Sequence, residues 1–185
     1  MQSALRSIVA FAVALAAAQA PAAAQTLRIG LQEDPDRLDP AQGGTFVGRI
    51  VFAALCDKLI DVDAKLNYRP QLANKWGWSE DGKALTLKLR PGVIFHDGTP
   101  LDAEAVKANL DRYRTADYSR RKGEVKSIAN VAIVDPTTVR IELSEPDAPL
   151  LSVLADRAGM MLSPKALAGA GENIATVVNA MQSTK

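Results

Sequence analysis

The sequence is poor in the side chains that carry most enzyme and metal chemistry: its 185 residues include one cysteine, Cys56, and one histidine, His96. A disulfide within the chain is therefore impossible. A tetrahedral zinc site made from cysteine and histidine would lack ligands, and a Cys56–His96 catalytic pair would lack a third, orienting group. We expect no catalytic site, metal or cofactor. Cys56 lies in an apolar run, which predicts a small buried side chain.

The chain also lacks an excess of charge of either sign, with 22 basic and 21 acidic residues. Arg6 is the only charged residue in the first 24, so the remaining residues carry a formal charge of zero. A nucleic-acid-binding protein usually shows a basic surplus or stripe, and we expect no such partner. Arg120, Arg121 and Lys122 form a short basic cluster followed by Glu124, which is typical of a solvated loop.

The N-terminus has the features of an export signal. Arg6 is followed by an unbroken apolar run over residues 8–18, which is too short to span a bilayer. Ala22-Ala23-Ala24 fits the small residues that signal peptidase requires. We expect cleavage after Ala24, giving a periplasmic protein. No cysteine lies at the cleavage site, so lipid attachment there is not expected.

Helical patterns are separated along the chain and have recognisable N-caps. Thr45 precedes apolar residues at helical spacing over residues 46–55, and Asp102 precedes Val106, Leu110 and Tyr113 on one face. Further helices are predicted over residues 72–76 (a short turn), 149–154 and 164–168, the last with Pro164 at its first position.

Strand patterns lie between these helices. Leu85, Leu87 and Leu89 alternate with polar residues, which predicts a half-buried strand. Asp81-Gly82 before it is typical of a two-residue hairpin turn. Other strands are predicted over residues 26–31, 59–62, 66–69, 127–134 and 138–143. The fold class is therefore mixed α/β (α+β), with several antiparallel hairpins.

A series of motifs in fixed order resembles the peptide-type solute-binding proteins (oligopeptide, dipeptide, nickel and glutathione binders) of bacterial ABC importers. The motifs are Leu38-Asp39-Pro40, Pro70-Gln71-Leu72-Ala73 with Trp76, Ser79-Glu80-Asp81-Gly82, Leu89-Arg90-Pro91-Gly92-Val93, Phe95-His96-Asp97-Gly98-Thr99-Pro100-Leu101, and Val134-Asp135-Pro136. Most of these residues form turns, caps or core. The resemblance thus identifies a fold more than a site.

The resemblance implies a two-lobed periplasmic-binding-protein-like fold that holds a solute between its lobes. It implies a peptide-like small solute, an ABC permease in the inner membrane as partner, no chemistry of its own, and a monomer. The loop after the first strand would face the ligand, with Asp34 as the preferred carboxylate and Glu33 and Asp36 beside it. Tyr118 and Arg120 are candidates on a second loop, where a ring could cover a peptide and an arginine could meet a carboxylate.

Family members are roughly three times longer, so we expect this chain to be an N-terminal fragment. Residues 1–24 would be the signal peptide, 25–58 the first segment of the large lobe, 59–148 the small lobe and 149–173 a return toward the large lobe, with 174–185 an atypical, disordered tail. Two alternatives stay open: a periplasmic hydrolase using acidic residues such as Asp34, Asp36 and Asp97, and a non-functional remnant. The sequence does not identify the solute.

Overall fold

The computed structural model describes residues 26–170. The predicted signal peptide and the predicted tail over residues 174–185 lie outside the described residues. Residues 26–31 belong to a separate unit from the rest of the chain. They form no strand, so the prediction of an opening strand there is wrong. A strand needs a hydrogen-bonded neighbour, and these residues have none in the part of the chain that the structure describes.

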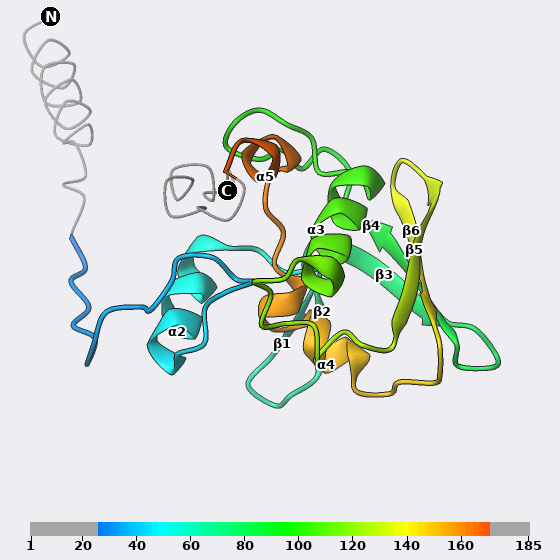
Figure 1. The fold of residues 1–185 in the computed structure, drawn as a ribbon, viewed down its shortest axis with the longest axis horizontal. Helices are drawn as coiled ribbons and strands as arrows, with labels where there is room; N and C mark the ends of the chain where they lie inside the picture. Colours follow the sequence, from blue (N-terminus) through cyan, green and yellow to red (C-terminus); the bar gives the residue numbers. More distant parts are fainter. Residues whose placement is uncertain (1–25, 171–185) are drawn as a thin grey trace, which may run out of the picture. The chain divides into compact units, whose positions relative to one another are not determined.

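A four-stranded antiparallel sheet forms the centre of the larger unit (Figure 1), in the order β3-β4-β6-β5. The strands are β3 (Ala73–Trp78), β4 (Ala84–Leu89), β5 (Ile128–Asp135) and β6 (Thr138–Leu143). Leu85, Leu87 and Leu89 of β4 are at most 1% exposed, as their alternation predicted. Each such leucine contributes roughly 1.5–3 kcal/mol by burial.

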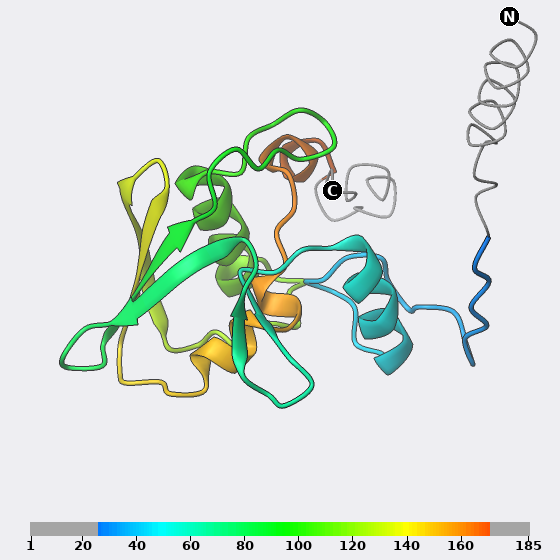
Figure 2. The same cartoon turned by 180° about the vertical axis from the view of Figure 1, so that it is seen from behind.

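The helix α3 (Ala103–Thr115) covers one face of this sheet (Figure 1). The Asp102 side chain accepts a hydrogen bond from the Ala105 N–H at 2.9 Å, which confirms the predicted N-cap. Val106, Leu110 and Tyr113 are fully buried. Seen from behind (Figure 2), the other face of the sheet is not covered by α3. Lys88 is exposed there, in line with the alternation of β4.

Shorter elements extend the core beyond the sheet. The strands β1 (Ile60–Val62) and β2 (Tyr68–Pro70) form a two-stranded antiparallel ladder. The helix α4 (Leu150–Leu154) leads into a 3-10 turn, η1 (Arg157–Gly159), and α5 (Pro164–Ala170) begins at Pro164 as predicted. A Cβ on Gly159 would lie 1.8 Å from the Leu154 carbonyl oxygen, so only glycine allows this close approach of η1 to α4.

The helix α2 (Phe46–Leu55) packs on a second, smaller cluster of buried residues. Among the described residues this cluster consists of Phe52, Cys56, Met160 and Leu162. The Thr45 side chain accepts a hydrogen bond from the Gly48 N–H at 3.1 Å, which confirms the N-cap. Burial raises the pKa of the Cys56 thiol to about 12, with further contributions from the charges of Asp57 and Asp39. Cys56 is therefore an unreactive core residue.

Two local predictions are wrong. Residues 72–76 were expected to form a helical turn, but residues 73–78 form β3, because β4 offers a ladder partner that the local pattern does not encode. The turn between β3 and β4 is longer than two residues, since the Ser79 N–H bonds to the Ala84 carbonyl at 2.9 Å. Only Gly82 in this turn has a positive φ, whereas a two-residue type I′ turn needs two.

Candidate functional site

The two loops that were predicted to face a ligand lie side by side. The Arg120 N–H donates to the Ala41 carbonyl at 2.8 Å. The Arg120 guanidinium lies 3.4 Å from the Asp36 carboxylate, so the structure brings these two predicted residues together. The loop over residues 32–44 and the loop over residues 116–124 therefore form one surface.

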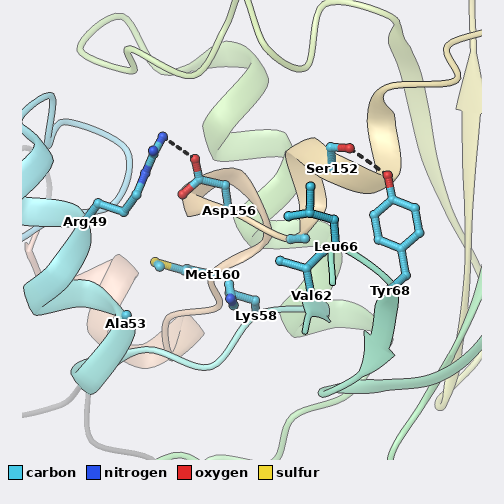
Figure 3. Close-up of a pocket in the computed structure, with 10 residues that line it drawn as sticks. Arg49, Ala53, Lys58, Val62, Leu66, Tyr68, Ser152, Asp156 and Met160 are labelled. Carbon is cyan, nitrogen blue, oxygen red and sulfur yellow. Dashed lines mark hydrogen bonds and ion pairs between the residues drawn. The ribbon is translucent and has the colours of Figure 1, made fainter. Parts of the chain in front are cut away.

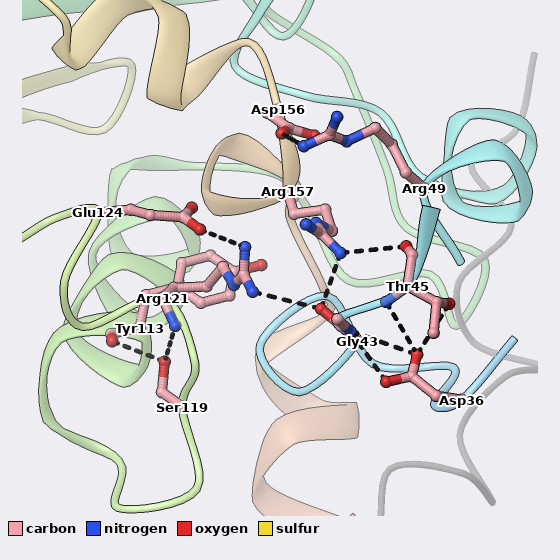
Figure 4. Close-up of polar contacts among 11 residues, drawn as sticks. Asp36, Gly43, Thr45, Arg49, Tyr113, Ser119, Arg121, Glu124, Asp156 and Arg157 are labelled. Carbon is pink, nitrogen blue, oxygen red and sulfur yellow. Dashed lines mark hydrogen bonds and ion pairs between the residues drawn. The ribbon is translucent and has the colours of Figure 1, made fainter. Parts of the chain in front are cut away.

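Asp36 is bound within the protein (Figure 4). Its carboxylate accepts hydrogen bonds from the Gly44 N–H at 3.0 Å and from the Thr45 hydroxyl at 3.2 Å, at the beginning of α2. Partial burial acts in the opposite direction, but these hydrogen bonds hold the pKa of the carboxyl below its usual value. Asp36 thus stabilises the N-terminus of α2. Glu33 and Asp34 are exposed and make no hydrogen bond or ion pair with the residues that the structure describes.

Tyr118 is half-buried and contacts Arg112. Arg112 forms a buried ion pair with Asp39, which the sequence did not predict. Arg112 reaches the Asp39 carboxylate with both terminal nitrogens, at 3.1 and 2.5 Å. The Arg112 guanidinium also lies over the Tyr118 ring, 5.2 Å from its centre, and its Nε donates to the Tyr118 hydroxyl at 3.1 Å. The two side chains of the ion pair are 9% and 3% exposed. The contact joins α3 to the loop before α2.

Figure 4 shows Arg49, Arg121 and Arg157 near the backbone of residues 43–45. Arg120 lies beside Gly44, so four arginines lie near this segment. Three of them have a carboxylate partner in the described structure: Arg49 with Asp156, Arg120 with Asp36, and Arg121 with Glu124.

The fourth, Arg157, has no carboxylate partner among the described residues. It is 7% exposed. Its Nη1 donates to the Gly43 carbonyl at 2.9 Å and to the Thr45 carbonyl at 3.5 Å. Its buried Nε has no partner in the described part of the chain. Burial and then the positive charge of Arg121 lower the pKa of the Arg157 guanidinium. A buried cation in this setting favours an anion.

The position of Arg157 comes from close packing on both sides. The turn η1 contains Arg157 and lies close against α4, at the contact of Gly159 with the Leu154 carbonyl. The Gly43 carbonyl also accepts from Arg121 Nη2 at 3.3 Å, so two guanidinium groups meet at one oxygen. A Cβ on Gly43 would lie 2.7 Å from the Phe52 ring, which fixes this carbonyl against α2. In sequence, the only signal is the Asp156-Arg157 pair between the apolar residues 153–155 and 158–162.

An open hollow of about 520 Å³ lies between α2, the β1–β2 ladder and α4 (Figure 3). Its polar groups are paired with each other or with neighbours: Arg49 with Asp156, Tyr68 with Ser152 at 2.6 Å, and Lys58 with Asp61. None of them is as short of partners as Arg157. The hollow is therefore a weaker candidate for an anionic ligand than the surroundings of Arg157.

The described residues offer no group of three or more His, Cys, Asp or Glu side chains that could hold a metal ion. His96 is exposed, and Cys56 is buried with a raised pKa. Within residues 26–170, no helix has the length and apolar character needed to cross a membrane.

Comparison with known proteins identifies the family. The model of the bacterial extracellular solute-binding proteins, family 5 (middle region), matches residues 67–179. The glutathione-binding protein GsiB of Escherichia coli K12 is 35% identical over 153 residues, which are 82% of this chain and 30% of GsiB. This chain thus spans about 30% of the length of the curated relatives it matches.

Solved structures show the same relation. The protein AgaA of A. tumefaciens R10, in complex with agropinic acid, matches with a TM-score of 0.71 and 29% identity, over 76% of this chain and 28% of AgaA. The protein NikA of Brucella suis, in complex with Fe(III)-EDTA, matches with a TM-score of 0.63 and 29% identity, over 71% of this chain and 27% of NikA. The predicted partial periplasmic-binding-protein fold is confirmed, and the family is one of binding proteins rather than enzymes. The chain belongs to the bacterial extracellular solute-binding proteins, family 5.

Proposed function

We propose that the chain contributes to the solute-binding component of an ABC importer, which takes up a carboxylate-bearing, peptide-like solute outside the cytoplasm and delivers it to a membrane permease. One observation carries this proposal: Arg157 is a buried cation that the described residues leave without a carboxylate, while each neighbouring arginine has one. The solute would supply the missing anion.

The solutes of the relatives support this chemistry. Glutathione, agropinic acid and EDTA, which the names of the matched proteins print, all carry carboxylates. Arginine suits a carboxylate because its planar fork donates two parallel hydrogen bonds. Arg121 would assist, since it shares the Gly43 carbonyl with Arg157.

The other site predictions remain proposals. Asp34 and Glu33 are exposed and uncommitted in the described structure, so they could meet a solute's amino group. Asp36, Arg120 and Tyr118 would support the ligand loops, because each already has an internal partner. The division into a small lobe over residues 59–148, flanked by segments 25–58 and 149–173 of a large lobe, also remains a proposal, as does export through a signal peptide that is not lipidated.

The test is a titration followed by NMR of the arginine side-chain N–H signals. Reduced glutathione should shift the Arg157 signal, and glutathione diethyl ester, which has no free carboxylate, should not. Since the chain spans about 30% of its relatives, we expect binding in the millimolar range. Arg157→Gln should weaken it by roughly tenfold or more, the value of one charge-assisted hydrogen bond.

The matched control is Arg69→Gln, which removes an exposed arginine that already has its own carboxylate, Asp63, and lies outside this cluster. It should leave the titration unchanged. Equal loss in both variants, or equal shifts by the diester, would remove Arg157 from the site. Submicromolar binding of a peptide by this chain alone would contradict the expectation that further polypeptide is needed for tight capture.

A further inference from the structure

The strand β5 lies at an edge of the sheet, since its only ladder partner in the described structure is β6. Its sequence has no charged residue and no proline before Asp135. Ile133 and Val134 are 38% and 60% exposed. An exposed apolar edge of this kind is a template for pairing with another strand.

The ladder pattern shows which backbone groups of β5 point away from β6. The Leu143 N–H donates to the Lys83 carbonyl at 2.8 Å, toward β4, so the preceding residue, Glu142, directs its backbone groups toward β5. Glu142 is the register partner of Asn130. Because backbone groups alternate along an antiparallel strand, Val131 directs its N–H and C=O toward the open edge.

Two cations from α3 occupy this edge. Lys107 Nζ donates to the Val131 carbonyl at 3.0 Å. Arg114 Nη1 donates to the Ala129 carbonyl at 2.7 Å and to the Ile128 carbonyl at 3.1 Å. These are charge-assisted hydrogen bonds to the acceptors that an incoming strand would need.

Asp111 holds both cations in place. Its carboxylate lies 2.8 Å from Lys107 Nζ and 3.0 Å from Arg114 Nη2. The spacing of i, i+4 and i+7 places the three side chains on one stripe of α3. Their side chains are between 23% and 35% exposed, so solvent screens them only in part.

We propose that the stripe formed by Lys107, Asp111 and Arg114 is a guard that prevents the β5 edge from pairing with β5 of a second copy of the chain. Two identical edges can pair antiparallel about a two-fold axis, and the open backbone groups of both copies are then hydrogen-bonded. With the guard in place the carbonyls of residues 128, 129 and 131 are occupied. Without it, the edge is a self-association surface.

The test compares two double variants by sedimentation velocity over a range of protein concentrations. Lys107→Met with Arg114→Met keeps the aliphatic stems and removes both donors. Lys65→Met with Arg37→Met is the matched control, because it makes the same chemical change at exposed side chains without a hydrogen bond in the described structure. The guard variant should dimerise with an association constant at least about tenfold above that of the control, the factor for one lost competing hydrogen bond.

A third variant separates strand pairing from other association. Ile133→Pro, added to the guard variant, removes an N–H of β5 that points to the open edge. The combined variant should be a monomer. A guard variant that stays monomeric while circular dichroism shows it folded would overturn the proposal, and so would dimers that persist with Ile133→Pro. If the guard variant does not fold, Lys107→Met alone, at a side chain that is 35% exposed, decides between the same outcomes.

Discussion

The sheet region and the α2 region of this molecule use apolar residues in different ways. In the sheet region, residues such as Leu87, Leu110 and Ile141 are fully buried between β strands and α3. In α2, Phe52 is buried, but Phe46 and Ile50 are 71% and 43% exposed. The sheet region therefore closes its own core, whereas α2 has apolar side chains on two faces and covers only one.

Apart from Arg49, whose guanidinium pairs with Asp156, the side chains of α2 are apolar or glycine. Phe46 and Ile50 leave an apolar face of α2 open in the described structure, whereas the exposed apolar residues of the sheet region, such as Ile133 and Val134, lie at its β5 edge. The difference can be tested by variants that act on the link between the regions, on each core, and on the exposed face.

The largest effect is expected at the link, the buried ion pair of Arg112 and Asp39. Arg112→Met would leave a buried carboxylate without its cation and should lower the free energy of unfolding by about 3–5 kcal/mol. Urea denaturation followed by circular dichroism measures this. Asp39→Asn combined with Arg112→Met should lose less than Arg112→Met alone, because no unpaired charge then remains. Equal losses in the single and the double variant would mean that the unpaired Asp39 carboxylate is not the cause of the loss.

The second prediction compares a substitution in the sheet core with one in the cluster beneath α2. Leu87→Ala should lower the free energy of unfolding of the whole larger unit by about 2–5 kcal/mol, because a cavity forms in the closed core. Phe52→Ala removes more atoms, but from the four-residue cluster beneath α2. It should shift the main urea transition by less than Leu87→Ala does. A larger shift would show that α2 is as well integrated as the sheet.

Cys56 reports local opening of α2. Its buried thiol has a pKa raised to about 12 and should react with a thiol reagent at neutral pH only when the cluster opens. Phe52→Ala should accelerate the reaction by about tenfold or more, which corresponds to about 1.4 kcal/mol of easier opening. Leu87→Ala serves as the control and should accelerate it less. The reverse order would place Cys56 under the control of the sheet core.

The elements that the sequence predicted are those whose signals are local. The helix α3 was predicted because Asp102 and the face of Val106, Leu110 and Tyr113 encode its start and its buried side. The strand β3 was missed because its structure depends on pairing with β4. Asp36 and Arg120 were named, and they do meet, but their internal pairing could not be inferred. Arg157 was missed because its burial depends on the approach of η1 to α4 and to Gly43, which is a tertiary feature.

A smaller effect is expected in acid. The nearby hydroxyl of Thr138 and hydrogen bonds from the N–H and hydroxyl of Thr137 lower the pKa of Asp135 to about 2. The Asn67 N–H is the main cause that lowers the pKa of Asp63 to about 2. Because these values lie below the ordinary 3.8, the carboxylates stabilise the fold above that pH, and the stabilisation is lost as the pH falls toward 2. Asp135→Asn should flatten the pH dependence of the sheet region in this window. An unchanged slope would contradict it.

The smallest effect is expected on the exposed face of α2. Phe46→Ser and Ile50→Ser should change the free energy of unfolding by no more than about 0.5 kcal/mol, as is usual for surface positions. The urea transition measures this, with Leu87→Ala as the reference for a buried residue. A loss well above 1 kcal/mol would show that this face is packed against another part of the chain.

The most direct test of the account is a crystal structure of the chain with bound glutathione. The account predicts a carboxylate of the ligand about 2.7–2.9 Å from the nitrogens of Arg157, with Arg121 close by. A ligand whose carboxylates lie elsewhere, with Arg157 still bound only to the carbonyls of Gly43 and Thr45, would contradict it.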